Sequence, residues 1–322
     1  MTGSDATGAI HHFMRLDGAG GASPVEHTTS IASGLWVHLD AAHPDSRSWL
    51  QDHTNLIPTA IEALLAPETR PRLATRGANL LLTLRGIGLD NSHGLEDMIS
   101  LRIWCDGTRM ISTRLRSLKS TQDVREALKE GAGPTSISQL LILWVEHMLK
   151  RMEAPLRHLE ESIIDMEDRV LEAGEQTSHA DLSQLRRQIL GLRRFLGPQR
   201  EALLALAGAK VDWLDDLDRA QLRESGERQS RHVDLLDHMY SRIAVAQEEL
   251  RNTLSNQMNQ RMYVMSIAAA LFLPLSFFTG LMGINVGGMP GIDDAHAFWI
   301  VVGLCGIAIS GLLFLFRKRG WW

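Results

Sequence analysis

The sequence predicts a mixed α+β domain, followed by long helices and then by two transmembrane helices at the C-terminal end. Two observations carry this prediction. Neither Met262–Gly283 nor Ala295–Phe316 contains an Asp, Glu, Lys or Arg, although 22% of the chain is charged. At about 1.5 Å per residue each stretch makes a helix of roughly 30 Å, which matches the hydrocarbon core of a bilayer. After Pro134, moreover, the hydrophobic period changes from two to that of a helix.

The N-terminal part alternates apolar and polar residues in several short segments. Leu35–Asp40 predicts a strand, and helical turns are expected near Ser46–Gln51 and Thr59–Leu65. Three further strands are predicted in NLLLTLRGI, DMISLRIWC and TRMISTRL, with a hairpin turn at Asp106-Gly107 between the last two. The first twenty-five residues are expected to be a short segment followed by a loop, and His11-His12 receives no role.

Three long amphipathic helices are predicted next, over Gln139–Glu172, Asp181–Leu206 and Asp212–Gln260. The last contains a heptad pattern that turns polar at Thr253 and Gln257, just before the first apolar stretch. No helix breaker stands between the two. One continuous helix is therefore expected to run from the charged region into the membrane.

The tail Arg317–Trp322 places cations and tryptophans directly after the second apolar stretch. Such a tail is typical of the end of a membrane helix, and the positive-inside rule makes it cytoplasmic. Two spans then put the N-terminus on the same side. The alternative is an apolar hairpin buried in a soluble core. The expected parts are residues 1–134 (cytosolic α/β subdomain), 135–261 (long helices), 262–283 (first span), 284–296 (external loop), 297–316 (second span) and 317–322 (basic tail).

Small or soft residues share one face of the first span. This face is either a helix-packing surface or the lining of a passage. It comprises Met262, Met265, Ala269, Leu273, Ser276, Gly280 and Gly283.

Asn285 follows the span directly. It is either a helix cap or, repeated around an axis in several chains, a neutral collar of amide oxygens for a cation. Asp293 and Asp294 in the external loop are either solvated or attract divalent cations toward such a mouth. His296 beside them is a weak zinc-ligand candidate.

Other chemistry finds little support. His232, Asp234 and His238 lie within two turns of the last long helix and form a weak cytosolic metal candidate. The two cysteines, Cys105 and Cys305, belong to no CxxC pair. The absence of HExxH, GxSxG and Walker patterns argues against catalysis and ATP-driven pumping. The net charge of −5 disfavours nucleic acid as a partner, and no resident cofactor is expected.

The stretch YVMSIAAALFLPLSFFTGLMGINVGGMPG, with Pro274 and the Gly-x-Asn signature at Gly283, Ile284 and Asn285, resembles the CorA-type divalent cation transporters. The segments TRPRL, STRLRSL, EGAGPTS and IIDMEDRVLE resemble the ZntB-like zinc branch, and the tail RKRGWW matches in kind. Magnesium members usually carry methionine where this chain has Ile284, which favours the zinc branch.

The resemblance implies a funnel-shaped homopentamer in a bacterial inner membrane, with the last long helix around a central pore. It also implies uptake of Zn²⁺ without nucleotide, with proton coupling left open. By position, Gly283, Ile284 and Asn285 would form the outer selectivity ring. The pore lining would follow as Asn259, Met262, Met265, Ala269, Leu273, Ser276 and Gly280.

Two alternatives stay open at this point. One is a Mg²⁺, Co²⁺ or Ni²⁺ channel of the same architecture that is gated by intracellular metal. The other is a membrane-anchored sensor or scaffold, for which the spans need only apolar length.

Overall fold

The computed structural model describes residues 8–25, 33–67, 69–89, 97–173, 179–284 and 295–318. The chain divides into two units, Met1–Glu248 and Glu249–Trp322. Helix α6 (Asp216–Met282) contributes residues to both units, which confirms the prediction of one uninterrupted helix. It begins at Asp216 rather than at Asp212 because Asp215 caps it, its Oδ1 accepting the N–H of Asp218 at 2.7 Å.

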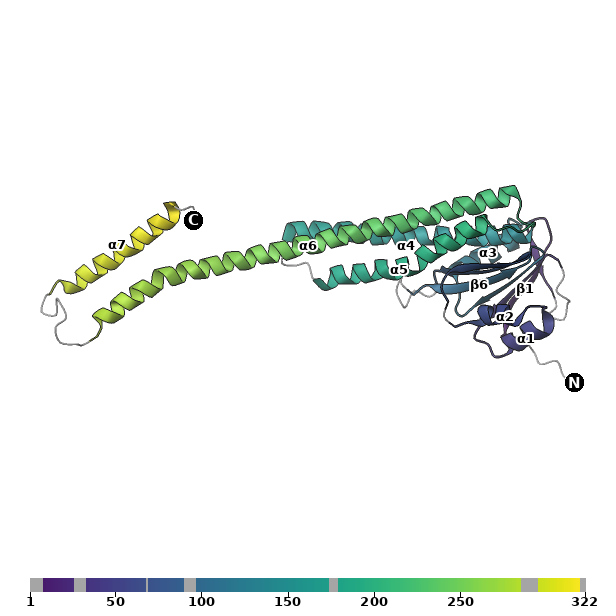
Figure 1. Ribbon diagram of the computed structural model, residues 1–322, viewed down its shortest axis with the longest axis horizontal. Helices are drawn as coiled ribbons and strands as arrows, with labels where there is room; N and C mark the ends of the chain where they lie inside the picture. Colours follow the sequence, from purple (N-terminus) through teal and green to yellow (C-terminus); the bar gives the residue numbers. More distant parts are fainter. Residues whose placement is uncertain are drawn as a thin grey trace. The chain divides into compact units, whose positions relative to one another are not determined.

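A seven-stranded mixed sheet organises the first unit (Figure 1). Its order is β2-β1-β3-β7-β6-β5-β4, and β3 pairs with β7 in parallel while the other neighbours are antiparallel. The strands are β1 (Ile10–Leu16), β2 (Ala22–Pro24), β3 (Leu35–Asp40), β4 (Arg72–Arg76), β5 (Asn79–Gly86), β6 (Ile99–Cys105) and β7 (Arg109–Arg114).

Helices cover both faces of this sheet. Helices α1 (Asp45–His53) and α2 (Pro58–Leu65) pack on one face. The opposite face carries α3 (Lys119–Lys129), α4 (Ile137–Ala173) and α5 (His179–Ala207).

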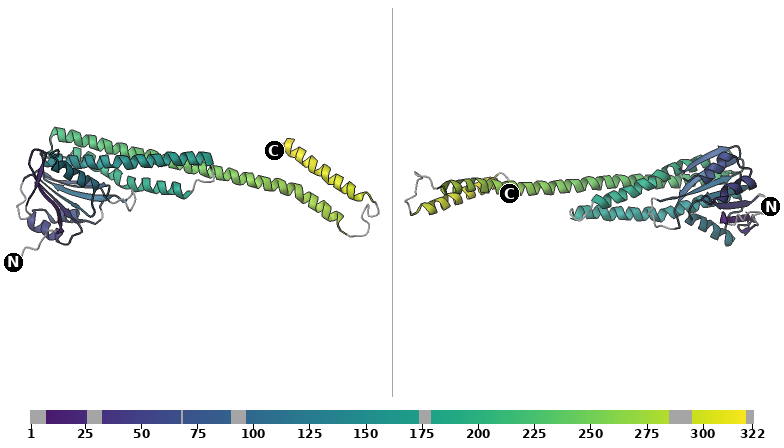
Figure 2. Two further views of the ribbon diagram at one scale, coloured as in Figure 1. Left: turned by 180° about the vertical axis from the view of Figure 1, so that it is seen from behind. Right: turned by 90° about the horizontal axis from the view of Figure 1, so that it is seen from below.

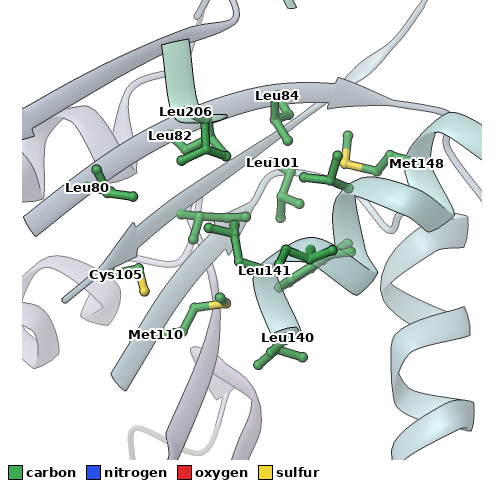
Figure 3. Close-up of a cluster of buried hydrophobic side chains, with 14 of the residues drawn as sticks. Leu80, Leu82, Leu84, Leu101, Cys105, Met110, Leu140, Leu141, Met148 and Leu206 are labelled. Atoms are coloured by element: carbon green, nitrogen blue, oxygen red, sulfur yellow. The ribbon is translucent and has the colours of Figure 1, made fainter. Parts of the chain in front are cut away.

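Period-two alternation explains how one sheet serves two cores. Leu80, Leu82 and Leu84 of β5 point to the α4 side, where they meet Leu141 and other leucines (Figure 3). Leu35, Val37 and Leu39 of β3 instead join the core beneath α1 and α2. Every side chain of β6 is buried, because this strand lies inside the sheet with a helical layer on each face.

The predicted hairpin at Asp106-Gly107 is confirmed. Gly107 has φ +85°, a left-handed conformation that side chains rarely adopt, and a Cβ there would lie 2.2 Å from Trp213. The Asp106 carboxylate accepts the N–H groups of Thr108 and Arg109, both at 2.9 Å. The turn therefore joins β6 to β7 in a single register.

The expectation for the first twenty-five residues was incomplete. A loop does follow the first segment, at residues 17–21, but Ile10–Leu16 form β1 and Ala22–Pro24 form β2, and β1 pairs with both β2 and β3. Strand β4 and helix α3 were likewise not anticipated. Strand β4 lies at the sheet edge with most of its side chains exposed, so it lacks the alternation that marks a half-buried strand.

In the first unit, α6 packs along α4 and α5, and Figure 2 shows the three helices side by side. Leu236, Met239 and Ile243 of the heptad pattern are at most 1% exposed. Arg242 forms a salt bridge with Glu167 of α4, and Arg186 of α5 donates to the Tyr240 hydroxyl at 2.8 Å. The heptad pattern is thus filled by helices of the same chain.

Candidate functional site

The second unit consists of the last part of α6 and helix α7 (Ala297–Lys318). Both helices are long and apolar enough to cross a membrane, and within the described residues none of the most apolar window of either helix is buried. Large apolar side chains are correspondingly exposed, such as Phe272 at 70%, Phe277 at 72% and Ile307 at 72%. Such an apolar surface suits a lipid environment.

One face of α6 is partly covered by α7. From Ile267 to Met282 the half-buried residues gather on one side of the helix: Ile267, Ala268, Leu271, Leu275, Phe278 and Met282. Leu275 and Phe278 share a groove with Leu304 and Cys305 of α7. This apolar stripe therefore fixes the rotation of α6 relative to α7.

The residues predicted to line a passage lie on the other side of α6. At 100° per residue their mean direction is roughly 170° from that of the stripe that faces α7. All are exposed, Met262 at 57%, Met265 at 74% and Leu273 at 71%. We call this set the open face; it comprises Asn259, Met262, Met265, Ala269, Leu273, Ser276 and Gly280.

The open face is small and weakly polar. A Cβ added at Gly280 would meet no atom within 4 Å. The Thr279 hydroxyl, beside this face, donates to the carbonyl of Leu275 at 2.9 Å, so its proton is used in a hydrogen bond within the helix. The Ser276 hydroxyl makes no hydrogen bond to any described residue and is free to meet water or an ion.

The open face ends where the helix closes. The N–H of Gly283 donates to Thr279 O at 3.0 Å and to Gly280 O at 3.1 Å, and Ile284 donates to Leu281 O at 3.4 Å. The two bonds that span only three residues, to Gly280 and to Leu281, tighten the last turn. Asn285, Asp293 and Asp294 lie outside the described residues, whereas His296 is exposed just before α7.

The cytosolic metal candidate is not assembled within the chain. His232 is buried, whereas Asp234 and His238 are exposed on α6. Among the described residues no group of three or more His, Cys, Asp or Glu side chains could hold a metal ion. His232, Asp234 and His238 therefore do not form a metal centre in one chain, because the helix points His232 into the core.

His11 and His12, to which the sequence analysis gave no role, lie in a strand. His11 and His12 belong to β1 and line a polar pocket of the first unit. The strand was hard to anticipate because its register with β3 shifts between Ile10 and His12. Such an irregularity breaks the alternation on which a strand prediction depends.

Comparison with known proteins agrees with this architecture. Residues 32–318 match the family described as CorA-like Mg²⁺ transporter protein. The chain belongs to this family. It is accordingly a divalent cation transporter of the CorA family and not an enzyme, and the anchored-sensor interpretation is excluded.

Individual relatives of the CorA-family chain cover its whole length. The divalent cation transporter CmaX of Pseudomonas aeruginosa is 36% identical over 326 residues, which span 98% of each chain. The zinc transport protein ZntB of Yersinia enterocolitica is 33% identical over 316 residues, 97% of this chain and 96% of the relative. The structure of full-length CmaX superposes with a TM-score of 0.84 at 34% identity and covers 99% of both chains.

Proposed function

We propose that this CorA-family chain takes up Zn²⁺ across a bacterial inner membrane, through a central pore that the open face of α6 lines in a homopentamer. The observation that carries the proposal is the open face itself. It is the side of α6 away from α7, its side chains are small, thioether or weakly polar, and it ends at the Gly-Ile-Asn sequence.

Two helices of one chain enclose no lumen, so a passage requires several copies. Helices in lipid associate through small residues that allow close packing. Copies of α6 arranged around an axis would direct the open face inward and leave α7 toward lipid. The polar residue Asn259 would then stand at the cytosolic end, where the helix surface changes from apolar to charged.

Asn285 follows the last turn of the helix and would supply a ring of amide oxygens at the outer mouth. Such oxygens are hard acceptors without fixed charge, suited to holding a hydrated divalent cation weakly enough to release it. Asp293 and Asp294 would raise the cation concentration near this ring, with a range set by a Debye length of about 8 Å at physiological salt. By the positive-inside rule, the basic tail supports a cytoplasmic position for both termini.

Zinc is favoured over magnesium by the similarity to ZntB, a zinc transport protein, and by Ile284 between the glycine and the asparagine. The open face carries no carboxylate or imidazole. Proton coupling would therefore depend on groups outside the first span, or on protons that move with water.

Flux into liposomes that contain the purified protein tests this function. Zn²⁺, Mg²⁺, Co²⁺ and Ni²⁺ are assayed separately, each with and without an inward proton gradient. The proposal predicts Zn²⁺ flux that Asn285→Ala abolishes while the oligomer stays intact. The control, Thr279→Ala, should keep the flux because that hydroxyl bonds only its own helix.

The other outcomes are informative. Flux of Mg²⁺ without flux of Zn²⁺ would contradict the zinc assignment and support the magnesium channel. Stimulation by inward protons would establish symport. Undiminished flux in Asn285→Ala would contradict the proposed selectivity ring.

A further inference from the structure

A polar pocket lies in the first unit, and none of its lining residues belongs to the open face of α6. It has a volume of about 350 Å³ and is formed between β1, the end of β7 and helix α3. This volume is at the lower end of the range for small-molecule sites. The side chains that matter for its chemistry are His11, His12, Arg114, Thr121, Arg125 and Lys129.

The charges of the pocket are not balanced. Arg114, Arg125 and Lys129 all line it, and among the described residues none of the three forms an ion pair. The Asp40 carboxylate lies outside the lining, 3.7 Å from His11, and offsets part of the positive charge near Arg114. The one carboxylate in the lining, Glu126, accepts a hydrogen bond from Gln122 at 3.0 Å. In a chain of net charge −5, this local excess of cations stands out.

Two buried polar atoms of the pocket residues also lack partners. Thr121 is 3% exposed and its hydroxyl has no hydrogen bond to the described residues. The Nε of Arg114 is buried and unbonded in the same way. Native proteins rarely leave buried donors unsatisfied, so each such group calls for a ligand or another partner.

The N-terminal end of helix α3 adds to the positive electrostatic potential of the pocket. Its N-cap residue, Leu118, makes no side-chain capping bond, and Thr121 lies in the first turn. The N–H groups and the dipole of a helix start favour an anion. Burial, together with the nearby Arg125 and Arg114, lowers the pKa of His12 to about 4, so this imidazole is neutral near pH 7.

We propose that this pocket binds a small dianionic oxyanion, either inorganic phosphate or the phosphate group of a small phosphorylated molecule. The guanidinium groups of Arg114 and Arg125 suit the fork geometry of phosphate oxygens. Lys129 adds a third cation, and the Thr121 hydroxyl donates a hydrogen bond. The site is distinct from the ion path, and its test does not depend on which metal is carried.

Calorimetric titration of the full-length protein in detergent tests the proposal, with inorganic phosphate and AMP as probes at constant ionic strength. Saturable binding is expected, together with a rise in Tm on adding the probe. Arg125→Gln should weaken binding at least about tenfold, the effect of losing a charged hydrogen bond. Arg223→Gln, which removes an exposed arginine of α6, should bind as wild type does.

Thr121→Val provides a second variant that keeps the shape of the side chain. It should weaken binding several-fold while the ligand-free protein becomes no less stable, since a buried unsatisfied hydroxyl is removed. Tighter binding of inorganic phosphate than of AMP would identify free phosphate as the ligand, and tighter binding of AMP a phosphorylated molecule. Absence of saturable binding, or equal binding by wild type, Arg125→Gln and Thr121→Val, would overturn the proposal.

Discussion

Helix α6 presents two kinds of apolar surface along one continuous chain. In the first unit Leu236 and Met239 are fully buried against helices of the same chain, whereas in the second unit Met265 is 74% and Leu273 71% exposed. The difference shows that apolar residues of one helix can be covered in different ways. Helices of the same chain cover the first part, whereas lipid and, as proposed, other copies of the chain cover the second.

The largest expected change in the free energy of unfolding comes from replacing a leucine by alanine, which we compare between the two parts of α6. Leu236→Ala should reduce the free energy of unfolding by about 2–5 kcal/mol, because it leaves a cavity in a packed core. Leu273→Ala should change it by less than about 0.5 kcal/mol, as at an exposed position. Chemical denaturation followed by circular dichroism measures both, and a large loss in Leu273→Ala would mean that this residue is packed rather than open.

A smaller, pH-dependent effect is expected at the ion pair between α3 and α4. The guanidinium of Arg151 hydrogen-bonds Asp123 and lowers the pKa of that carboxyl. Because the folded pKa lies below the unfolded value, this stabilisation is present above the unfolded pKa and is lost as the pH falls through the folded one.

Asp123→Asn should therefore cost about 1–2 kcal/mol at neutral pH, where a charged hydrogen bond is lost beside a partly solvated arginine. The difference from wild type should shrink below about pH 4. Urea denaturation at a series of pH values measures it. A difference that stays constant through the acid range would exclude the carboxylate charge as its source.

The smallest effect is expected where α6 is tied to α4. Replacing Arg242 by Gln removes its salt bridge to Glu167. The side chain of Arg242 is 24% exposed and that of Glu167 is 28% exposed. Solvent screens a pair at this exposure, so the variant should lose about 0.5–1 kcal/mol. Thermal unfolding measures this loss of stability. A loss as large as that of Leu236→Ala would contradict the small contribution expected of this salt bridge.

Much of the first unit was predictable because its signals are local. The hairpin at Asp106-Gly107 and the strand Leu35–Asp40 follow from turn chemistry and hydrophobic period. Helix α3 was missed because only Val124 and Leu128 supply buried apolar residues within it. The parallel pairing of β3 with β7 depends on contacts between distant segments, which alternation within one strand does not encode.

The candidate site was predictable in a different way. Three- and four-residue spacing places Met265 and Ser276 on one helical face from the sequence alone, and the structure leaves that face open. The partner of this face is a property of the assembly, so its role as a pore lining remains a prediction. The burial of His232 could not be predicted, because its spacing to Asp234 and His238 says nothing about which helix covers it.

Cysteine accessibility tests the central claim most directly, namely that the open face of α6 meets water. In a Cys305→Ser background, Ser276→Cys on the open face is compared with Leu275→Cys on the stripe that faces α7. The native Cys105 stays silent, because it is 1% exposed and burial raises the pKa of its thiol to about 12.

A membrane-impermeant thiol reagent should modify Ser276→Cys in reconstituted protein and block its cation flux. The same reagent should leave Leu275→Cys unmodified and its flux unchanged. Modification of Leu275→Cys with protection of Ser276→Cys would contradict the account, because it would place the water path on the face that α7 covers.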